Sequence, residues 1–339
     1  MDDLTAWLDG ATVLVTGATG RIGGRLTTEL RGLGASVRTV VLPDDARASA
    51  LPSDVDVITG SLSDTAVVER ATRGVDAVVH LAALMDWNPE ANAALFESNV
   101  QATYLLLDHV VQHSPNLRRF VLASSDEVYS ALDVKEQIIE DHPIVPYSFY
   151  GLTKQLDEVL AEFYHRVHDV PTSIARFSLT AEADEITRHD GWSGRLFFAS
   201  GLRAILDAIG RPDAVSAIDA AVDDAEHTLV LARDTDGEPY RFQFCDARDL
   251  VSGLLCLLTA PGAIGETCNL SGPEAFSYAD VVPRLSEAIG VPYVDLHLEG
   301  ERIDLSTSTE RARKVAGFVP EIGIEEILAQ VTRTANAAS

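Results

Sequence analysis

The feature that most limits how this chain can fold is a glycine-spaced turn near its N-terminus. Residues 11–15 form a short β-rich run, and residues 16–23, TGATGRIG, follow it directly. Ile22, Leu26 and Leu30 then recur at helical spacing. A strand, a glycine turn and a helix in this order present main-chain N–H groups at a helix N-terminus, where phosphate binds well. The sequence therefore predicts a dinucleotide-binding turn.

Further β-rich runs follow along the chain, and helical patterns lie between most of them. We expect strands at residues 36–42, 55–58, 76–81, 119–123 and 173–177. They are apolar without alternation, as in strands buried on both faces. This order predicts an α/β, Rossmann-like, doubly wound parallel sheet. We expect this domain to take residues 1–177, with 241–261 returning to it. A smaller, discontinuous C-terminal substrate domain then takes 178–240 and 262–339.

Composition narrows the class of partner. The chain has 52 acidic and 26 basic residues, a net charge of −26, which disfavours nucleic acid because phosphate binding needs a basic stripe. Its apolar runs are too short for a bilayer, and its acidic start lacks signal-peptide features. We therefore expect a cytoplasmic protein without a membrane partner. Cys245, Cys256 and Cys268 form no C-x-x-C pair, which predicts reduced cysteines and no metal site.

The run YSFYGLTK at 147–154 places Tyr150 and Lys154 one helical turn apart. A tyrosine with a pKa of ~10 is a poor base at neutral pH. A neighbouring ammonium and an oxidised nicotinamide would stabilise the phenolate and lower that pKa. By itself the pair is either an acid–base couple or a chance surface pair.

Several motifs occur together and in order. They are TGATGRIG, DAVVHLAA at 76–83, a serine pair before Val128 and Tyr129, and the Y-x-x-x-K pair. The chain in this respect resembles the extended short-chain dehydrogenase/reductases, in the branch of NAD-dependent epimerases and dehydratases. Segments 99–103, 244–249, 269–272 and 306–320 extend the resemblance over nearly the whole chain. It implies an enzyme that oxidises a hydroxyl by hydride transfer to NAD, with a sugar or sugar derivative as substrate.

The resemblance also implies catalytic roles. Tyr150 is expected to be the acid/base and Lys154 its helper, while Ser125 binds the substrate oxygen, with Ser124 as the alternative serine. Asp126 and Glu127 resemble the carboxyl pair with which nucleotide-sugar 4,6-dehydratases eliminate water. In relatives that do not eliminate water, an acidic residue here holds a sugar hydroxyl or caps the turn.

A second set of residues is expected to contact the cofactor. The expected contacts are Gly17, Thr19, Gly20, Arg21, Ile22, Gly23, Asp44, Ser61, Leu62, Leu81, Ala82, Ala83, Asn99, Tyr150 and Lys154. Asp44 or Asp45, after the second strand, would repel a 2′-phosphate and favour NAD over NADP. Arg21 and Arg38 are the nearby cations that would accept one. We read Asp64 as a helix N-cap.

The substrate contacts are expected to be Leu84, Ser125, Asp126, Trp192 and Arg195. Leu179 stands where nucleotide-sugar enzymes of this branch usually have an asparagine that touches the sugar phosphate. A nucleotide-linked sugar and a free sugar, sugar acid or other hydroxy or carbonyl compound therefore both stay open.

Three kinds of function remain at this point. The first is epimerisation or dehydration with NAD retained, and the second is net dehydrogenase or reductase activity. The third is a non-catalytic dinucleotide sensor, which the Tyr150–Lys154 pair disfavours. Helices expected at 93–113 and 153–168 have apolar sides, from which the resemblance implies a homodimer.

Overall fold

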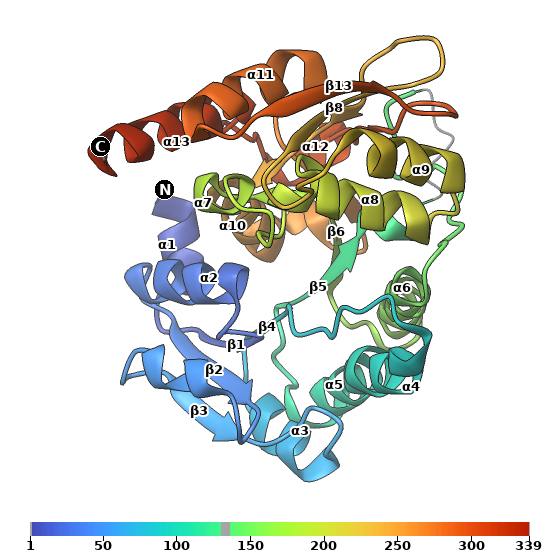
Figure 1. Ribbon diagram of the computed structural model, residues 1–339. Coiled ribbons are helices and arrows are strands. Elements are labelled where there is room, and N and C mark those ends of the chain that lie inside the picture. Colours follow the sequence, from blue (N-terminus) through green and yellow to red (C-terminus); the bar gives the residue numbers. More distant parts are fainter. Residues whose placement is uncertain (1, 130–135, 339) are drawn as a thin grey trace.

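The structure, a computed structural model, describes residues 2–129 and 136–338 (Figure 1). Its larger part is a seven-stranded sheet of order β11-β6-β5-β4-β1-β2-β3, in which every neighbouring pair is parallel. These strands are β1 (Thr12–Thr16), β2 (Ser36–Val41), β3 (Asp56–Thr59), β4 (Ala77–His80), β5 (Arg119–Ser125), β6 (Thr172–Phe177) and β11 (Thr267–Leu270). The expected α/β, Rossmann-like class is confirmed.

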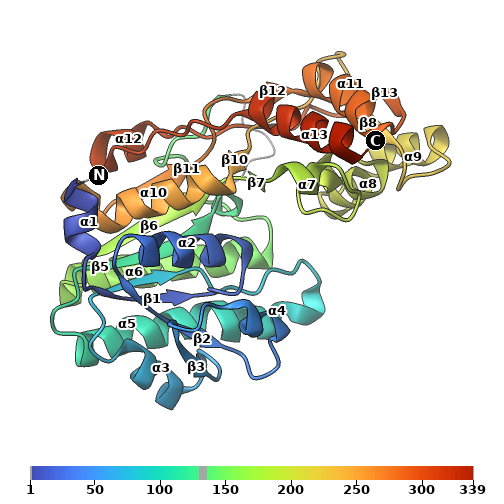
Figure 2. The ribbon, with the colours of Figure 1, turned by 90° about the vertical axis from the view of Figure 1, so that its left-hand side faces the viewer.

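Helices cover both faces of this sheet because successive apolar side chains point to opposite sides. Val13 and Val15 pack beneath α2 and α10, whereas Leu14 packs with α3 and α5 on the other face. Figure 2 shows α2 and α10 above the sheet and α3 and α5 below it. The helices of this part are α1 (Asp2–Leu8), α2 (Arg21–Gly32), α3 (Thr65–Thr72), α5 (Ala102–His113), α6 (Phe149–His168), α10 (Ala247–Thr259) and α12 (Glu310–Ala316).

All the strands expected from the sequence are present, but two helices differ from their expected course. The helix expected at 93–113 consists of α4 (Asn92–Leu95), a π-helical turn η3 (Phe96–Gln101) and α5. The helix expected at 153–168 starts earlier, at Phe149, because Ser148 caps it by accepting a hydrogen bond from the Gly151 N–H. Asp64 caps α3 as expected.

The smaller part lies beyond the carboxyl ends of the large sheet's strands, at the top of Figure 1. An aromatic cluster that includes Phe197, Phe244, Phe276 and Tyr278 lies in its core. Its strands are β7 (Thr180–Ala181), β8 (Leu229–Arg233), β9 (Arg241–Phe242), β10 (Cys245–Asp246), β12 (Phe276–Ser277), β13 (Tyr293–His297) and β14 (Asp304–Leu305). Its helices are α7 (Ala183–Ile186), η6 (Gly194–Leu196), α8 (Ala199–Ala208), α9 (Pro212–Ala221), α11 (Tyr278–Ile289) and α13 (Ile324–Ala338).

Two of the expected domain boundaries are wrong in detail. β11 was expected in the smaller domain, but it pairs with β6 as the edge strand of the large sheet, and α12 packs beside it. At residue 241, β9 pairs with β12 and β14 of the smaller part, so the return to the large part starts later. The sequence hides β11 because its four residues, TCNL, are short and half polar.

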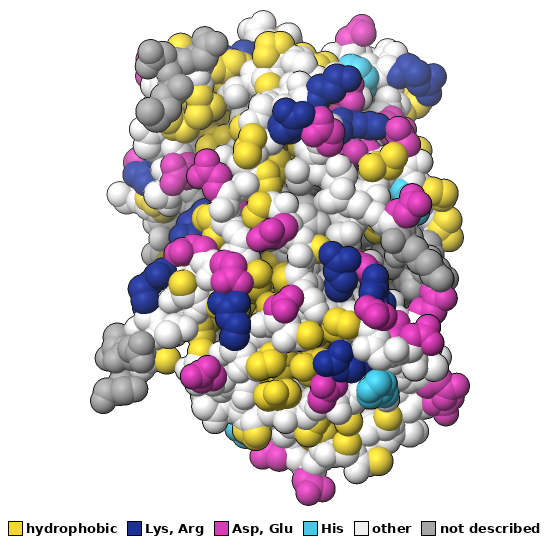
Figure 3. Space-filling model, turned by 90° about the horizontal axis from the view of Figure 1, so that it is seen from above, with side chains coloured by type: hydrophobic (Ala, Val, Ile, Leu, Met, Phe, Trp, Pro, Cys, Tyr) yellow, Lys and Arg dark blue, Asp and Glu magenta, His cyan; other side chains and the backbone are white. Residues whose placement is uncertain are grey.

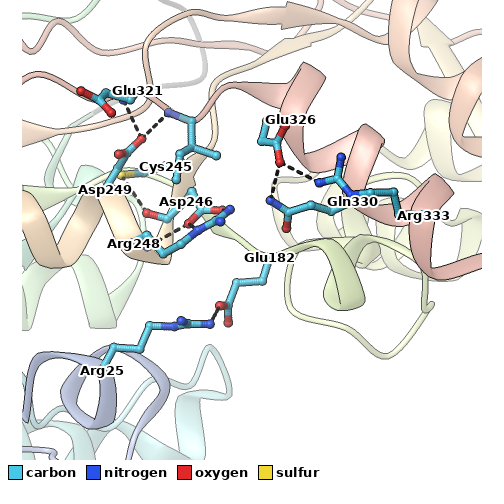
Figure 4. A network of polar contacts seen from close by, with 11 residues as sticks. Arg25, Glu182, Cys245, Asp246, Arg248, Asp249, Glu321, Glu326, Gln330 and Arg333 are labelled. Atoms are coloured by element: carbon cyan, nitrogen blue, oxygen red, sulfur yellow. Dashed lines mark hydrogen bonds and ion pairs between the residues drawn. The ribbon is translucent and has the colours of Figure 1, made fainter. Parts of the chain in front are cut away.

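Ion pairs join the two parts around α2. Arg25 on α2 pairs with Glu182, the N-cap of α7, and Figure 4 shows this pair facing the Asp246–Arg248 pair of α10. On the face seen in Figure 3, basic side chains are interspersed with acidic ones. Within the described part of the chain, no helix is long and apolar enough to cross a membrane.

Candidate active site

The glycine turn lies at the carboxyl ends of β1 and β4, where the strand order reverses. Gly17 has a φ of +72°, a conformation that glycine adopts without strain. A Cβ on Gly23 would lie 2.2 Å from the Gly17 carbonyl oxygen, so glycine alone lets α2 pack this closely. Gly20 is the N-cap of α2, whose first N–H groups lack partners within the helix. The turn fits a pyrophosphate held by main-chain N–H groups.

The start of the loop after β4 is tied to this turn. Thr16 Oγ1 accepts hydrogen bonds from the N–H groups of Leu81 (3.1 Å) and Ala82 (3.0 Å). The same hydroxyl lies 2.7 Å from Nδ1 of His80, and the other ring nitrogen lies 3.1 Å from Thr103 Oγ1. Burial lowers the pKa of His80 to about 3, so its ring is neutral. These contacts fix the start of the loop after β4, where the predicted cofactor residues Leu81 and Ala82 lie.

Asp45, rather than Asp44, faces the glycine turn. Its carboxylate accepts a hydrogen bond of 2.7 Å from Thr19 Oγ1 and caps the short helix η1 (Ala46–Ala50). Hydrogen bonds from Arg47 and then Thr19 hold the pKa of Asp45 well below its usual value. Asp44 is exposed. The sequence left the two aspartates open as cofactor contacts, and in the structure Asp45 is the one whose carboxylate contacts the glycine turn.

Four further residues that were predicted to contact the cofactor lie in three different settings. The guanidinium of Arg21 pairs with Glu185 of α7, so this side chain links the two parts of the chain. Ile22 and Leu62 pack against the two helical layers of the large part. Ser61 lies in the loop after β3, at the same edge of the sheet as the glycine turn.

Asn99 lies in the π-helical turn η3 and clamps the loop after β4. Its side chain accepts a hydrogen bond from the Leu84 N–H (2.8 Å) and donates to the Leu84 carbonyl (3.0 Å). It also donates to Thr153 Oγ1 on α6, at 3.0 Å. The loop is therefore held against the helix that carries Tyr150, although Ala83 and Leu84 themselves are exposed.

Ser125 and Tyr150 meet where β5 ends and α6 begins. A Cβ on Gly151 would lie 2.5 Å from the Glu127 carbonyl oxygen, so this glycine lets α6 start against the turn after β5. The Ser125 hydroxyl lies near enough to the Tyr150 phenol to lower its pKa, against the larger rise that burial causes. Ser124 instead donates to Glu158 at 2.5 Å. Of the two candidate serines, Ser125 is the one beside Tyr150.

Lys154 is buried beside this pair. Its ammonium donates to the Ala123 carbonyl at 3.1 Å, lies 3.6 Å from Asp157, and lies 5.9 Å from the centre of the Tyr150 ring. Burial lowers the pKa of Lys154, and Asp157 opposes that shift. Burial raises the pKa of Tyr150, and Glu127 and Asp126 raise it further. In the chain alone, the acidifying effect expected from Lys154 therefore does not outweigh burial.

Asp126 and Glu127 form the short helix η4 (Asp126–Val128) after Ser125. Burial, followed by the charge of Glu127, raises the pKa of Asp126 to about 7. Glu127 accepts hydrogen bonds from the Trp87 indole (3.2 Å) and the Ser148 hydroxyl (2.6 Å), which oppose the rise that burial causes in its pKa. Near neutral pH the Asp126 carboxyl can donate a proton. The hydrogen bonds from Trp87 and Ser148 favour the charged form of Glu127.

A cavity of about 400 Å³ opens beside these carboxyls, between the two parts of the chain. Of the predicted substrate contacts, Ser125, Asp126, Trp192 and Arg195 line it, and Leu84 does not. It is lined by Met85, Trp87, Ser125, Asp126, Glu127, Tyr147, Leu179, Trp192, Arg195, Leu196, Gly201, Ala204, Ile205, Ala208, Ile209, Phe242, Ile303 and Leu305.

Trp87, which the sequence did not single out, completes one wall of the cavity. The rings of Trp87 and Trp192 stack with centres 6.0 Å apart. The guanidinium of Arg195 lies 3.8 Å from the Trp192 ring centre and 5.1 Å from that of Trp87. A Cβ on Gly201 would lie 2.4 Å from Arg195 Cα, so this glycine lets α8 hold Arg195 against the two rings.

The three cysteines are free, and the described residues contain no group of His, Cys, Asp and Glu side chains that could hold a metal ion.

Comparison with known proteins agrees with this geometry. The model of the NAD dependent epimerase/dehydratase family matches residues 13–271. A dTDP-glucose 4,6-dehydratase of Streptomyces griseus is 33% identical over 334 residues, covering 94% of this chain and 92% of that one. A dTDP-glucose 4,6-dehydratase of Actinoplanes sp. is 30% identical over 187 residues, 49% of this chain and only 56% of its own length. The chain thus spans about half the length of that relative.

A solved structure is similar over nearly the whole chain. It is a short-chain dehydrogenase/reductase superfamily protein from Agrobacterium tumefaciens with bound NAD. It is 35% identical, covers 96% of this chain and 97% of its own, and has a TM-score of 0.85. A glycine turn at a strand-order reversal, the site around Tyr150 and a family match over most of the sequence thus agree: the chain belongs to the NAD-dependent epimerase/dehydratase family, within the short-chain dehydrogenase/reductase superfamily.

Proposed function

We propose that this chain oxidises a secondary hydroxyl of a sugar-type substrate by hydride transfer to NAD, changes the neighbouring carbon, and returns the hydride to the substrate, so that NAD is regenerated. The observation that carries the proposal is the cluster at the end of β5. Ser125 meets Tyr150 there, Lys154 lies behind them, and Asp126 and Glu127 face the same cavity. The family and the dehydratase relatives support a reaction of this type.

The position of each residue in the cluster suggests its role in the reaction. NAD, when bound at the glycine turn, supplies the oxidant for the hydroxyl-bearing carbon. Ser125 holds the substrate oxygen, and Tyr150 accepts the hydroxyl proton. Since burial raises the pKa of Tyr150, the phenol loses its own proton only when positive charge offsets that burial. Lys154 supplies such a charge when it is protonated, and Asp157, 3.6 Å away, opposes the lowering of the Lys154 pKa that burial causes.

The neighbouring carboxyls of Asp126 and Glu127 favour elimination of water over simple epimerisation. Once the hydroxyl carbon is a ketone, the neighbouring C–H is acidic enough for a carboxylate to remove its proton. Glu127, which accepts hydrogen bonds from Trp87 and Ser148, fits that base. Asp126, with its pKa raised to about 7, fits the acid that protonates the departing hydroxyl.

We also propose NAD rather than NADP as the cofactor. Asp45 lies in the loop after β2, beside the glycine turn, and its depressed pKa keeps it charged. A carboxylate there can accept a hydrogen bond from a ribose hydroxyl and repels a 2′-phosphate. Arg38, one candidate for binding a phosphate, is engaged by Asp56 and by three carbonyls near the end of α3.

The reaction type is tested in deuterated water. The NAD-loaded protein is given candidate sugars, and products are read by mass spectrometry while absorbance follows reduced nicotinamide. We expect solvent deuterium in the product and no accumulation of reduced nicotinamide. One equivalent of reduced nicotinamide per product, without deuterium, would instead make the chain a net dehydrogenase and overturn the proposal.

We further propose that two copies of the chain associate through the outer faces of η3, α5 and α6. These faces expose large apolar side chains, which monomers seldom leave uncovered over a wide area. The exposed residues are Phe96, Tyr104, Val111, Val159, Phe163 and Val167. Val159→Arg is expected to halve the mass seen by light scattering, whereas Val319→Arg, an exposed valine elsewhere, leaves it unchanged. A parent protein that is already monomeric would contradict the pairing.

A further inference from the structure

The two ends of the cavity differ in chemistry. The end at β5 holds the polar groups of Ser125, Asp126 and Glu127. The other end is built by the smaller part of the chain, where one side of α8 faces β9 and β14. Apolar side chains line that end, chiefly Ile205, Ile209, Phe242, Ile303 and Leu305.

Positive charge is scarce along this cavity. Arg195 is the one lysine or arginine among the described residues that line it, and its guanidinium is stacked on Trp192 with Glu127 nearby. Arg241 and Arg302, close in sequence to the apolar end, both pair with Asp304. A diphosphate in this cavity would therefore meet a single cation that already faces a carboxylate.

The apolar side chains at this end favour some ligand groups over others. Moving a multiply charged diphosphate from water onto apolar side chains costs free energy unless paired cations compensate. An alkyl or aryl group gains free energy in the same place in proportion to the area that it covers. Met85 and Trp87, at the polar end, are each 40% exposed, so apolar surface stays uncovered there too.

We propose that the substrate is an uncharged, sugar-type alcohol bearing an apolar alkyl or aryl substituent, not a nucleoside diphosphate sugar. The polar ring lies by Ser125, and the substituent runs along α8 toward Phe242. This rests on the proposed function, because it takes the reacting hydroxyl to lie at the Ser125 end. It extends that function by assigning the apolar end to the part of the substrate that does not react.

Calorimetry on the NAD-loaded Tyr150→Phe variant tests the assignment without heat from turnover. The probes are glucose, galactose and mannose, each as free sugar, as its 4-nitrophenyl and octyl glycosides, and as its nucleoside diphosphate derivative. We expect at least one aryl or alkyl glycoside to bind about tenfold more tightly than both its free sugar and its nucleotide form. Equal affinity for glycoside and free sugar, tighter binding of the nucleotide form, or no binding by any glycoside would overturn the inference.

A pair of variants locates the substituent. Ala208 is exposed and lines the apolar end, so Ala208→Phe fills that end without disturbing the core. It is expected to weaken glycoside binding about tenfold and to leave free-sugar binding unchanged. Ala221→Phe, at the exposed end of α9, is the matched control and should change neither. Unchanged glycoside affinity in Ala208→Phe would place the substituent elsewhere and refute the assignment.

The two proposals fail in different ways. If a nucleotide sugar is bound and turned over while the glycosides are ignored, the substrate inference falls and the proposed function stands. If glycosides bind as expected but Tyr150→Phe turns them over as fast as the parent, the proposed function falls and the binding result stands.

Discussion

The two walls of the site are built from different materials. The cofactor wall is main chain: Gly17 and Gly23 are packed so closely that a Cβ on Gly23 would lie 2.2 Å from a carbonyl oxygen. The opposite wall, which lines the substrate cavity, is made of side chains. Trp192 and Arg195 stack together there, and Ile205 lies beyond them. A main-chain wall depends little on side-chain identity and so suits a ligand that related enzymes share, whereas a side-chain wall can change its ligand by substitution.

Removal of the Tyr150 hydroxyl is expected to have the largest effect on turnover while leaving NAD binding unchanged. Tyr150→Phe is expected to lower turnover by about 10³-fold, because general acid–base catalysis typically contributes 10²–10⁴-fold. NAD affinity, measured by calorimetry, should stay near that of the parent. Tyr293→Phe, at an exposed tyrosine of β13, is the control. Substantial residual turnover in Tyr150→Phe would mean that another group moves the proton.

The main-chain wall should tolerate no side chain at its closest point. Gly23→Ala is expected to weaken NAD binding roughly 100-fold, because the turn must move to admit the methyl group. Gly24→Ala is the matched control in the same helix, since its Cβ would lie 3.5 Å from the nearest atom, an ordinary contact. Equal NAD affinity in the two variants would show that the turn does not hold the pyrophosphate.

One side chain at the edge of the main-chain wall is expected to select the cofactor. Asp45→Ala should reduce the preference for NAD over NADP by about tenfold, because it removes the charge that repels a 2′-phosphate. Asp44→Ala, its exposed neighbour, should leave the ratio of the two affinities unchanged. A change in Asp44→Ala alone would restore the aspartate first expected from the sequence.

A smaller effect tests the electrostatics of the substrate wall. Because the pKa of Asp126 is raised from 3.8 to about 7, folding favours its protonated form. That stabilisation is complete below about pH 4 and is lost as the pH rises to about 7. Asp126→Asn stays neutral, so its melting temperature should gain on that of the parent between pH 4 and 7 and level off above. Asp207→Asn, exposed on α8, controls for the loss of a carboxylate, and a flat difference for Asp126→Asn would refute the buried acid.

The main-chain wall could be predicted from the sequence because its signals are local. Gly17, Gly20 and Gly23 follow a strand and open a helix, and Tyr150 and Lys154 lie one turn apart on α6. Such contacts depend on neighbours in sequence, so pattern and position are enough to place them. The sequence also favours Ser125 over Ser124 by its position before Val128 and Tyr129, and in the structure Ser124 is bound to Glu158.

The side-chain wall could be predicted only in part, because distant segments build it. Trp192 and Arg195 were named from their own segment, but their partner Trp87 lies about a hundred residues earlier and carries no motif. β11 was not predicted as a strand of the large sheet for a similar reason. Its four residues become a strand there only because they pair with the free edge of β6. Long-range packing left no pattern in either place.

The main-chain wall and the side-chain wall must meet at the reacting group for this chemistry to occur. A crystal structure of the NAD complex measures this most directly, without knowledge of the substrate. We predict the pyrophosphate at Gly17–Gly23, the nicotinamide ribose within hydrogen-bonding distance of Lys154, and the Tyr150 hydroxyl directed at the nicotinamide and the cavity. NAD bound elsewhere, or a Tyr150 hydroxyl turned away from the nicotinamide, would contradict it.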